Sequence, residues 1–500
     1  MILILVFLLY LSTKYLLIMS DSPIRVHFVS MECYPCAKVG GLADVVGSLP
    51  KYLNDQGADV TVFIPKYRMK WFEGKSFDYR HVSHFYLHHE RIDYGIAEVT
   101  DANLGFRLMV IDIPGKMDRD GVYAASNGNF FGDEIQRHLC FQRAYLNFIV
   151  LSEYTPDVVH CHDHHTGLIP FIMQNCDGYR NLTSVPVVFT IHNERYQGVF
   201  PWTMHYLLPQ FDSWKAGMLD WGNLINPLAS AVKCSWKVTT VSPSYMEELK
   251  YNSMGLEALF NQENHKCTGI LNGIDNEVWD PATDPYLTTH FEGNVDEFKL
   301  NNKQALLEGS QLDPELPLVA FIGRFAGEKG ADLLPGIIEE SLRRELPLNF
   351  VVLGTGDKWV EHQMGILAYH RPDKVAAMIT YNEAVSHKIY AGADFLLMPS
   401  RVEPCGLNQM YAMRYGTVPI VHNLGGLKDS VSYFDGDQGT GLKFNSLDFY
   451  HIFEEFQRAI YLHGAKKLLT TARTNGMEAD FSWVKSAGQY MDIYRSVTGK

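Results

Sequence analysis

The sequence predicts an α/β protein with two doubly wound domains, each a parallel sheet covered by helices. Short apolar runs rich in β-forming residues alternate with amphipathic stretches of helical period, and this alternation occurs in two successive series. With 500 residues the chain is also too long for one compact core, and this length is typical of two or three domains. Two series in such a chain indicate two domains.

The first series contains six expected strands. They are apolar on both faces, which is typical of a parallel sheet buried between helices. Amphipathic stretches such as residues 133–153 separate them and predict the covering helices. The expected strands are residues 24–30, 60–64, 106–113, 157–161, 187–191 and 237–241.

The second series has five expected strands and is followed by a helical end. Pro, Asp and Asn accumulate at residues 281–302 and 311–317, so we place one domain at residues 21–300 and the next at 301–480. Residues 447–463 and 482–497 read as helices, and we treat 481–500 as a terminal helix. The expected strands are residues 318–323, 350–353, 378–381, 395–399 and 418–421.

Residues 1–20 form a separate apolar segment. The apolar run ends at residue 18 and is interrupted by Ser12, Thr13 and Lys14. It is short for a spanning helix, which needs about 20 apolar residues, and it lacks the basic start of a signal peptide. We favour a start site assigned too early over a weak membrane anchor, and we expect no stable membrane insertion.

Charge and cysteine content limit the partners. The net charge is −14, which argues against a nucleic-acid partner and requires local cations wherever an anion binds. Eight scattered cysteines suit a reducing compartment, so we expect a cytoplasmic protein. Cys33 and Cys36 form one CxxC pair, which is compatible with a redox pair or half a zinc site, but no second pair supports either.

Ligands of open α/β sheets bind beyond the carboxyl ends of the strands. After the first expected strand come Lys38, Gly40 and Gly41. Paired glycines let the backbone turn tightly and approach a ligand, and the helix that follows offers N–H groups to an anion. A plain strand–helix connection with a surface lysine explains the same residues equally well.

Histidines dominate the next exits in the first half. Residues 160–165 include four histidines and Asp163, which suggests a metal, polar substrate contacts or packing. Polar contacts are favoured, because adjacent residues diverge after a strand and no HxxxH pair is present. His192 and Asn193 follow another expected strand. The histidine there is compatible with a base, a hydrogen-bond donor or a packed core residue, and the core residue is favoured. Asn272 lies in an Asn-Gly turn that is mostly structural.

Two exits in the second half carry charge. Arg324 and Lys329 precede a helical stretch, an unfavourable place for two cations unless an anion lies between them. They predict a diphosphate site, with a pair of surface cations as the alternative. Glu403, followed by residues 405–407 at a helix start, can accept from hydroxyl groups while the neighbouring N–H groups bind oxygens. That combination suits a polyhydroxyl ligand.

Taken together, these segments resemble the bacterial glycogen synthases and plant starch synthases, retaining glucosyltransferases of family 5 with a two-domain GT-B fold. The resemblance extends from about residue 24 to the end of the chain, and the full ordered set of motifs is highly specific. Its carriers are Lys38-Val-Gly-Gly-Leu-Ala-Asp-Val-Val46, His162-Asp163, Phe189-Thr-Ile-His-Asn193, Thr240-Val-Ser-Pro243, Gly269-Ile-Leu-Asn-Gly-Ile-Asp275, Gly323-Arg324 with Lys329-Gly330, and Pro399-Ser-Arg-Val-Glu-Pro-Cys-Gly-Leu407.

The resemblance implies transfer of glucose from ADP-glucose to the non-reducing 4-hydroxyl of an α-1,4-glucan, with retention, in glycogen biosynthesis. It implies two domains facing a deep cleft, a final helix that crosses back to the first domain, and no metal or pyridoxal phosphate. A UDP-glucose-dependent synthase and a non-catalytic glucan-binding homologue remain as alternatives. We see no lysine motif for the pyridoxal phosphate of a phosphorylase.

The resemblance also assigns roles. Arg324, Lys329 and Lys38 stabilise the departing diphosphate, the last beside Gly40 and Gly41. His192 lies beside the anomeric carbon and eases its developing charge through its backbone carbonyl. The absence of an evident carboxylate nucleophile suggests attack on the same face. By the same resemblance, Asp163, Asn193 and Asn272 bind sugar hydroxyls. Glu403 and the backbone of Cys405, Gly406 and Leu407 bind the glucose 3- and 4-hydroxyls. Tyr381 lies against the nucleotide base.

Four positions depart from the family pattern. Tyr411 stands where related hexosyltransferases have a second glutamate, which matches the glucan-synthase branch. His164 replaces a tryptophan and alters a stacking surface. Leu424 replaces a threonine and removes a possible phosphate contact, and Lys388 replaces an arginine, which weakens bidentate pairing.

Overall fold

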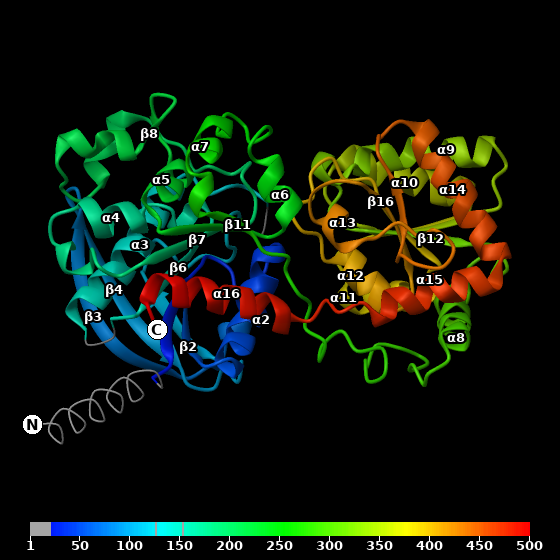
Figure 1. The fold of residues 1–500 in the computed structure, drawn as a ribbon, viewed down its shortest axis with the longest axis horizontal. Helices are drawn as coiled ribbons and strands as arrows, with labels where there is room; N and C mark the ends of the chain where they lie inside the picture. Colours follow the sequence, from blue (N-terminus) through cyan, green and yellow to red (C-terminus); the bar gives the residue numbers. More distant parts are fainter. Residues whose placement is uncertain (1–21, 126–127, 153–154) are drawn as a thin grey trace, which may run out of the picture. The chain divides into compact units, whose positions relative to one another are not determined.

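A nine-stranded mixed sheet forms the centre of the first half of this computed structural model, which describes residues 22–125, 128–152 and 155–500. The sheet order is β11-β10-β7-β6-β1-β2-β5-β4-β3 (Figure 1). Its strands are β1 (Ile24–Val29), β2 (Ala58–Pro65), β3 (Phe77–Leu87), β4 (Glu90–Val99), β5 (Arg107–Asp112), β6 (Val158–His162), β7 (Val187–Ile191), β10 (Lys237–Thr240) and β11 (Cys267–Gly269). The six expected strands are confirmed.

The antiparallel pair β3–β4 was not expected, and it makes the sheet mixed rather than wholly parallel. Residues of β3 alternate between exposed and less exposed positions over most of their length. A strand with one solvated face lacks the continuous apolar run on which the prediction relied.

The second sheet has six parallel strands in the order β14-β13-β12-β15-β16-β17. All five expected strands are present, and β17 is added at the edge. The strand β14 ends at Ile379, so Tyr381 lies in the loop that follows. The bounds are β12 (Leu318–Ile322), β13 (Asn349–Gly354), β14 (Val375–Ile379), β15 (Phe395–Met398), β16 (Val418–His422) and β17 (Leu442–Phe444).

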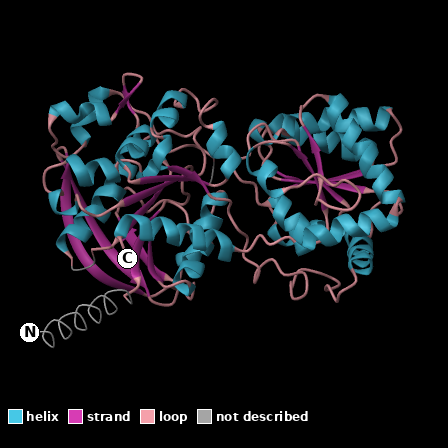
Figure 2. Cartoon of the chain, viewed as in Figure 1, coloured by secondary structure: helices cyan, strands magenta, loops and turns pink. Residues whose placement is uncertain are grey.

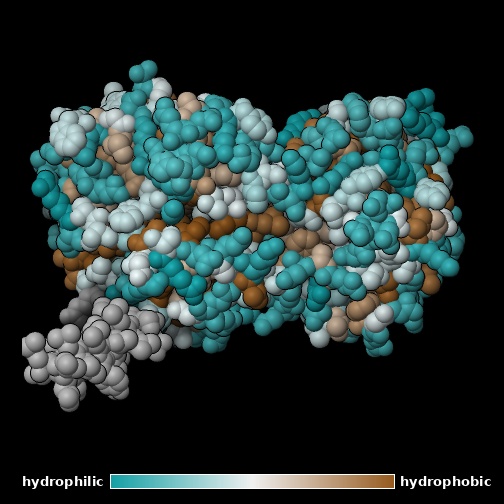
Figure 3. Space-filling model, viewed as in Figure 1, coloured by the Kyte–Doolittle hydropathy of each residue, from teal (hydrophilic) through white to brown (hydrophobic). Residues whose placement is uncertain are grey.

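The chain divides into two compact units. Unit 1 contains the chain up to Thr240 with Leu249–Thr268 and Trp483–Lys500, and unit 2 contains Val241–Glu248 with Gly269–Ser482. Residues 1–20, set apart in the sequence, lie outside the described residues, and among those described no helix has the length and apolar character that crossing a membrane needs. In Figure 3 most of the visible surface of each unit is hydrophilic.

Helices surround both sheets (Figure 2). Unit 1 has α2 (Gly41–Asp55), α3 (Glu134–Leu151), α4 (Ile169–Asn175), α5 (Pro227–Cys234), α7 (Glu257–Gln262), α16 (Trp483–Thr498) and the 3-10 turn η2 (His164–Thr166). Unit 2 has α6 (Pro243–Glu248), α8 (Val295–Leu307), α9 (Leu334–Arg343), α10 (Lys358–His370), α11 (Glu383–Gly392), α12 (Asn408–Arg414), α13 (Gly425–Ser430), α14 (Phe449–Gly464), α15 (Lys466–Glu478) and the 3-10 turn η7 (Gly327–Lys329).

The last helix, α16, belongs to unit 1, as the expected crossing back requires (Figure 1). Its buried Tyr494 hydroxyl lies 2.8 Å from Nδ1 of His160 on β6. The Gln56 side chain, which follows α2, donates to the carbonyl of Val484 at 2.8 Å. The terminal helix therefore packs against the elements that carry the first and fourth predicted strand exits.

Candidate active site

In unit 2 the exits of the neighbouring strands β12 and β15 bring a lysine and a glutamate together. Lys329 Nζ lies 2.6 Å from Glu403 Oε1. The other carboxylate oxygen, Oε2, accepts from the Ser400 hydroxyl at 2.9 Å. The Glu403 side chain is 4% exposed and that of Lys329 28%, so a buried carboxylate holds a cation that water still reaches.

Gly330 explains how these two exits approach so closely. Its backbone is left-handed, with φ of +67°, and a Cβ there would lie 1.9 Å from the Pro399 carbonyl oxygen. The carbonyl of Glu328 also accepts from the N–H groups of Arg401 and Val402. Glycine is required at this position, and the loop that carries Lys329 is fixed to the loop that carries Glu403.

Arg324, the second predicted cation, lies on the same loop and pairs with Glu328. Its side chain is 57% exposed. The Glu328 side chain is 13% exposed, so an incoming anion meets an exposed guanidinium that is held by a largely buried carboxylate. Arg401, which the sequence did not single out, pairs with Asp332 at 2.6 Å.

The Gly425–Gly426 pair lies directly against the Glu403 segment. A Cβ on Gly425 would come within 2.1 Å of the Glu403 carbonyl oxygen, and one on Gly426 within 2.1 Å of that of Cys405. The Gly426 N–H donates to the Glu403 carbonyl at 3.0 Å. Leu424 is the N-cap of α13 and supplies no side-chain cap, so the departure at this position leaves a helix start without the hydroxyl that a threonine brings.

Asn272 and residues 405–407 complete the predicted set in unit 2. Asn272 is buried and its Oδ1 has no hydrogen-bond partner among the described residues. A buried unpaired amide oxygen costs free energy unless a ligand hydroxyl donates to it. Cys405 is buried, Gly406 has φ of +72°, and Leu407 is the N-cap of α12. The Asn408 side chain ties this helix start to the Ile322 carbonyl of β12 at 2.7 Å.

Tyr411 is a packing residue. Its ring stacks on Trp279 with centroids 3.7 Å apart, and the other stacking partner of Trp279 is His387 at 4.0 Å. His387 Nδ1 lies 2.6 Å from Asp284 Oδ2. The aromatic stack fills the position at which related transferases have a second carboxylate, while Lys388 is exposed.

Tyr381 lies between β14 and α11 with 70% of its surface exposed. An exposed ring at the carboxyl end of a parallel strand is placed to stack on a planar ligand. The contact of Tyr381 with a nucleotide base stays a prediction.

In unit 1 the first strand exit contains a residue that the sequence reasoning missed. Glu32 accepts the N–H groups of Val39 and Gly40 at 2.6 and 2.9 Å on one oxygen, and the Tyr123 hydroxyl at 2.7 Å on the other. Burial raises the pKa of Glu32, and these three bonds partly oppose that shift. A carboxylate shortly after a buried strand was the sequence feature that could have pointed to Glu32.

The other residues of this exit keep an open side. Lys38 Nζ pairs with Asp44 at 2.7 Å, with side chains 28% and 22% exposed. A Cβ on Gly40 or Gly41 would meet nothing within 4 Å, and neither has positive φ. Neither the turn nor a protein neighbour therefore demands glycine here, and the close approach of a ligand stays a prediction. Glu32 already accepts the Gly40 N–H.

Asp163 anchors the exits of β6 and β7. Its Oδ1 accepts the His192 N–H at 2.7 Å and the Asn193 N–H at 3.4 Å. Its φ of +57° is uncommon for a residue with a side chain, and such strain persists where the surroundings enforce it. Burial raises the pKa of Asp163 to about 7. Asp163 thus positions the two residues that were predicted to face the sugar.

His192 is held through its ring. His192 Nε2 lies 3.0 Å from Nδ1 of the buried His162. Desolvation lowers the pKa of His192 to about 3, so its imidazole is neutral at pH 7 and a weak base. This geometry favours a role for the His192 backbone over proton transfer by its ring.

The CxxC pair consists of two buried free thiols, and all eight cysteines are free. Burial raises the pKa of Cys33 well above its usual range, which disfavours a reactive thiolate.

Among the described residues, one group of side chains could hold a metal ion, namely Glu134, His138 and His164 in unit 1. Within the described part of unit 2, no such group surrounds Lys329 and Glu403.

Comparisons with known proteins identify the family of the chain. The starch synthase catalytic domain family matches residues 25–262, and the glycosyl transferases group 1 family matches residues 302–448. The glycogen synthase of Flavobacterium johnsoniae is 44% identical, covering 95% of this chain and 99% of the relative. That of Streptococcus gordonii is 35% identical, covering 95% of this chain and all of the relative.

Solved structures share the fold. The catalytic domain of starch synthase IV from Arabidopsis thaliana, bound to ADP and acarbose, has a TM-score of 0.85 and 31% identity over 96% of this chain and all of that one. Sucrose-phosphate synthase from Thermosynechococcus elongatus has a TM-score of 0.61 at 17% identity, which concerns the fold alone. The two sheets, the paired strand exits and these relatives together show that the chain is a glycosyltransferase of GT-B fold and belongs to the glycogen synthase and starch synthase family.

Proposed function

We propose that the protein transfers glucose from ADP-glucose to the non-reducing 4-hydroxyl of an α-1,4-glucan with retention, as a step of glycogen biosynthesis. The observation that carries the proposal is the Lys329–Glu403 pair at adjoining strand exits, in a chain of this family. The ADP and acarbose bound by the related starch synthase IV support a nucleoside diphosphate and a glucan-like ligand.

The leaving diphosphate sets the chief electrostatic demand. Breaking the bond between the anomeric carbon and the phosphate oxygen builds negative charge on the diphosphate. Lys329, Arg324 and Lys38 supply cations without a metal ion, and each such contact in a site that excludes water is worth about 2.7–4 kcal/mol. In the structure these three cations pair with Glu403, Glu328 and Asp44, respectively.

The sugar is held by buried polar groups. Glu403, fixed by Lys329 and Ser400, accepts from glucose hydroxyls together with the backbone of residues 405–407. The unpaired Oδ1 of Asn272 accepts another hydroxyl. Asp163 and Asn193 serve the remaining hydroxyls, and the Asp163 bond to the His192 N–H orients the His192 carbonyl toward its proposed role at the anomeric carbon.

The chemistry is a same-face displacement. The acceptor 4-hydroxyl forms the new bond to the anomeric carbon, the bond to the phosphate oxygen breaks, and the hydroxyl proton moves to that oxygen. His192 does not take this proton, because its lowered pKa makes the ring a poor base. No metal or pyridoxal phosphate takes part.

A radiochemical assay tests the proposal. The full chain is incubated with labelled ADP-glucose and glycogen, with and without EDTA, and incorporation into glycogen is measured. We expect incorporation in both conditions and α-linked product. Tight glycogen binding without ADP release would instead identify a non-catalytic glucan-binding homologue, as the departures at Leu424 and Lys388 would then explain.

The base of the donor is a second question. Competition between ADP-glucose and UDP-glucose in one reaction compares their kcat/KM values directly. We expect preference for ADP-glucose, and preference for UDP-glucose would make the enzyme the UDP-dependent alternative.

Eight free thiols also support the proposed cytoplasmic location, which cell fractionation tests.

A further inference from the structure

A helix and a strand exit of unit 1 bring two buried imidazoles and a carboxylate together. Glu134 and His138 lie one turn apart at the start of α3, and His164 opens η2 after β6. One ligand atom from each lies within 4.8 Å of the others. The sequence disfavoured a metal because adjacent residues diverge after a strand and no HxxxH pair supported one, but α3 supplies a carboxylate and a second imidazole from elsewhere in the chain.

Each of the two imidazoles has a buried nitrogen without a partner. His138 and His164 are each 5% exposed, and neither Nε2 of His138 nor Nδ1 of His164 has a hydrogen-bond partner among the described residues. A buried polar atom left unpaired costs about 1–3 kcal/mol. A neutral imidazole can bind a metal ion through such an unpaired nitrogen.

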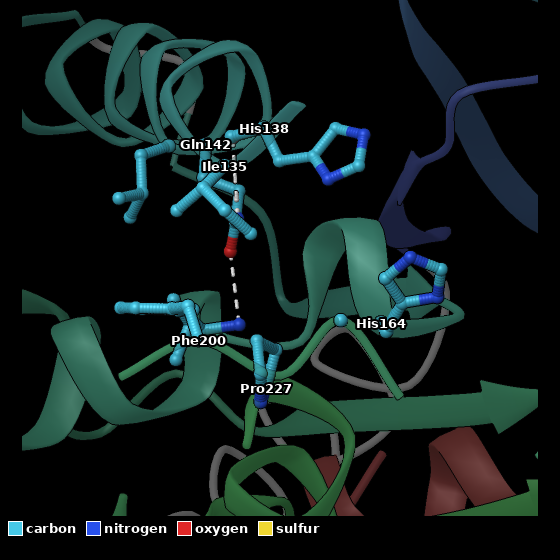
Figure 4. Close-up of a pocket in the computed structure, with 9 residues that line it drawn as sticks. Ile135, His138, Gln142, His164, Phe200 and Pro227 are labelled. Carbon is cyan, nitrogen blue, oxygen red and sulfur yellow. Dashed lines mark hydrogen bonds between the residues drawn. The ribbon is translucent and has the colours of Figure 1, made fainter. Parts of the chain in front are cut away.

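The space around the rings is small and fixed. His138 and His164 line a cavity of about 10 Å³, the size of one water molecule by that measure. Their rings lie on the same side of the group of residues drawn in Figure 4. Gly198 packs against the His164 ring, where an added Cβ would lie 2.5 Å from Cδ2.

We propose that Glu134, His138 and His164 bind one divalent transition-metal ion of the Zn²⁺ class. Two imidazoles and a carboxylate are a known zinc ligand set, with a fourth position left for water. Bonds of ~2.1 Å place the ligand atoms of a tetrahedral site about 3.4 Å apart. The exposed Glu134 closes the remaining separation by rotating its side chain.

The bound ion would join the start of α3 to η2, directly after Asp163. It would therefore stabilise the strand exit that positions His192 and Asn193, without touching the transferred sugar. The proposal does not rest on the proposed function, because its readout is metal content and not glucosyl transfer.

The test uses the full chain without a histidine tag, freed of metal and dialysed against buffered Zn²⁺. Metal content by mass spectrometry and the visible absorption of the Co²⁺-substituted protein are measured for the wild type, Glu134→Gln and His164→Gln. We expect one equivalent of Zn²⁺ in the wild type, affinity at least tenfold lower in Glu134→Gln, and loss of the intense low-coordinate Co²⁺ bands in both variants.

A matched control removes the exposed neighbouring pair by His88→Gln with His89→Gln, and this variant should keep one equivalent. Because Glu134 is exposed, Glu134→Gln should unfold at the wild-type temperature in EDTA, while Zn²⁺ should raise the Tm of the wild type alone. The proposal is overturned if the wild type holds less than stoichiometric Zn²⁺, if Glu134→Gln binds as the wild type does, or if the control loses the metal.

Discussion

Replacing Lys329 by methionine tests the central electrostatic claim. Methionine keeps the length and much of the volume of the side chain and removes its charge. Glu403 then keeps only the Ser400 hydroxyl at 2.9 Å, while its side chain stays 4% exposed. The variant removes both the proposed diphosphate contact and the partner of a buried carboxylate.

The two losses have different magnitudes. Loss of a contact that forms with the leaving diphosphate lowers kcat by about 10²–10³. Removing one partner of a fully buried pair costs 3–5 kcal/mol of stability. Lys329 is 28% exposed and solvent screens its charge, so we expect a fall of about 1–3 kcal/mol in the free energy of unfolding.

The double variant Lys329→Met with Glu403→Gln separates the two roles. Neutral glutamine needs no cation, so stability should return largely to the wild-type value, measured by urea unfolding. Turnover of ADP-glucose on glycogen should stay low, because the diphosphate still lacks its lysine. If kcat of the double variant recovered to within threefold of that of Glu403→Gln alone, Lys329 would act only by neutralising Glu403, and the leaving-group role would be refuted.

Three further substitutions test other contacts. Gly330→Ala should lower the free energy of unfolding, measured in urea, by more than 2 kcal/mol, because φ is +67° and the added Cβ meets the Pro399 carbonyl. The control Gly327→Ala, where the added Cβ has open space, should lower the free energy of unfolding much less. Asp163 has a pKa of about 7 in the folded state, above its unfolded value, so the folded state binds more protons. The free energy of unfolding should therefore fall as pH rises from about 4 to 7, by at most ~4 kcal/mol. Asp163→Asn should flatten this pH dependence, and an unchanged slope would contradict the assignment. Tyr381→Ala should raise KM for ADP-glucose by about tenfold through lost stacking, with Tyr381→Phe near the wild type.

Much of the architecture could be predicted from the sequence, because buried parallel strands are continuous apolar runs. Every expected strand is present, with bounds shifted by a few residues as at β14. The β3–β4 hairpin escaped detection because its exposed face interrupts the apolar signal. The glycines also differed in kind: Gly330 is demanded by backbone contact, while Gly40 and Gly41 have open space around them.

The partners of the predicted cations could not be predicted in the same way. Spacing alone shows a lysine or arginine beyond a strand, but not which carboxylate lies beside it. Lys329 meets a glutamate 74 positions along the chain, a contact created by the parallel neighbours β12 and β15. Glu32 escaped for a related reason, because two of its hydrogen bonds come from backbone N–H groups, which have no sequence signature, and a third comes from Tyr123, 91 positions along the chain.

The pairing of these cations does not argue against an anion site, because the pairs differ in their solvation. The Arg324 guanidinium is 57% exposed, whereas its partner Glu328 is 13% exposed. A diphosphate can therefore bind the exposed N–H donors of the guanidinium while Glu328 keeps its own bond. Glu403 is buried and cannot be left alone without a penalty of several kcal/mol. Lys329 must then touch the diphosphate while it still holds Glu403, and an ammonium group with three donors can serve both. An arginine at position 329 would have to fit a planar fork between two anions, so Lys329→Arg should lower kcat although it preserves the charge.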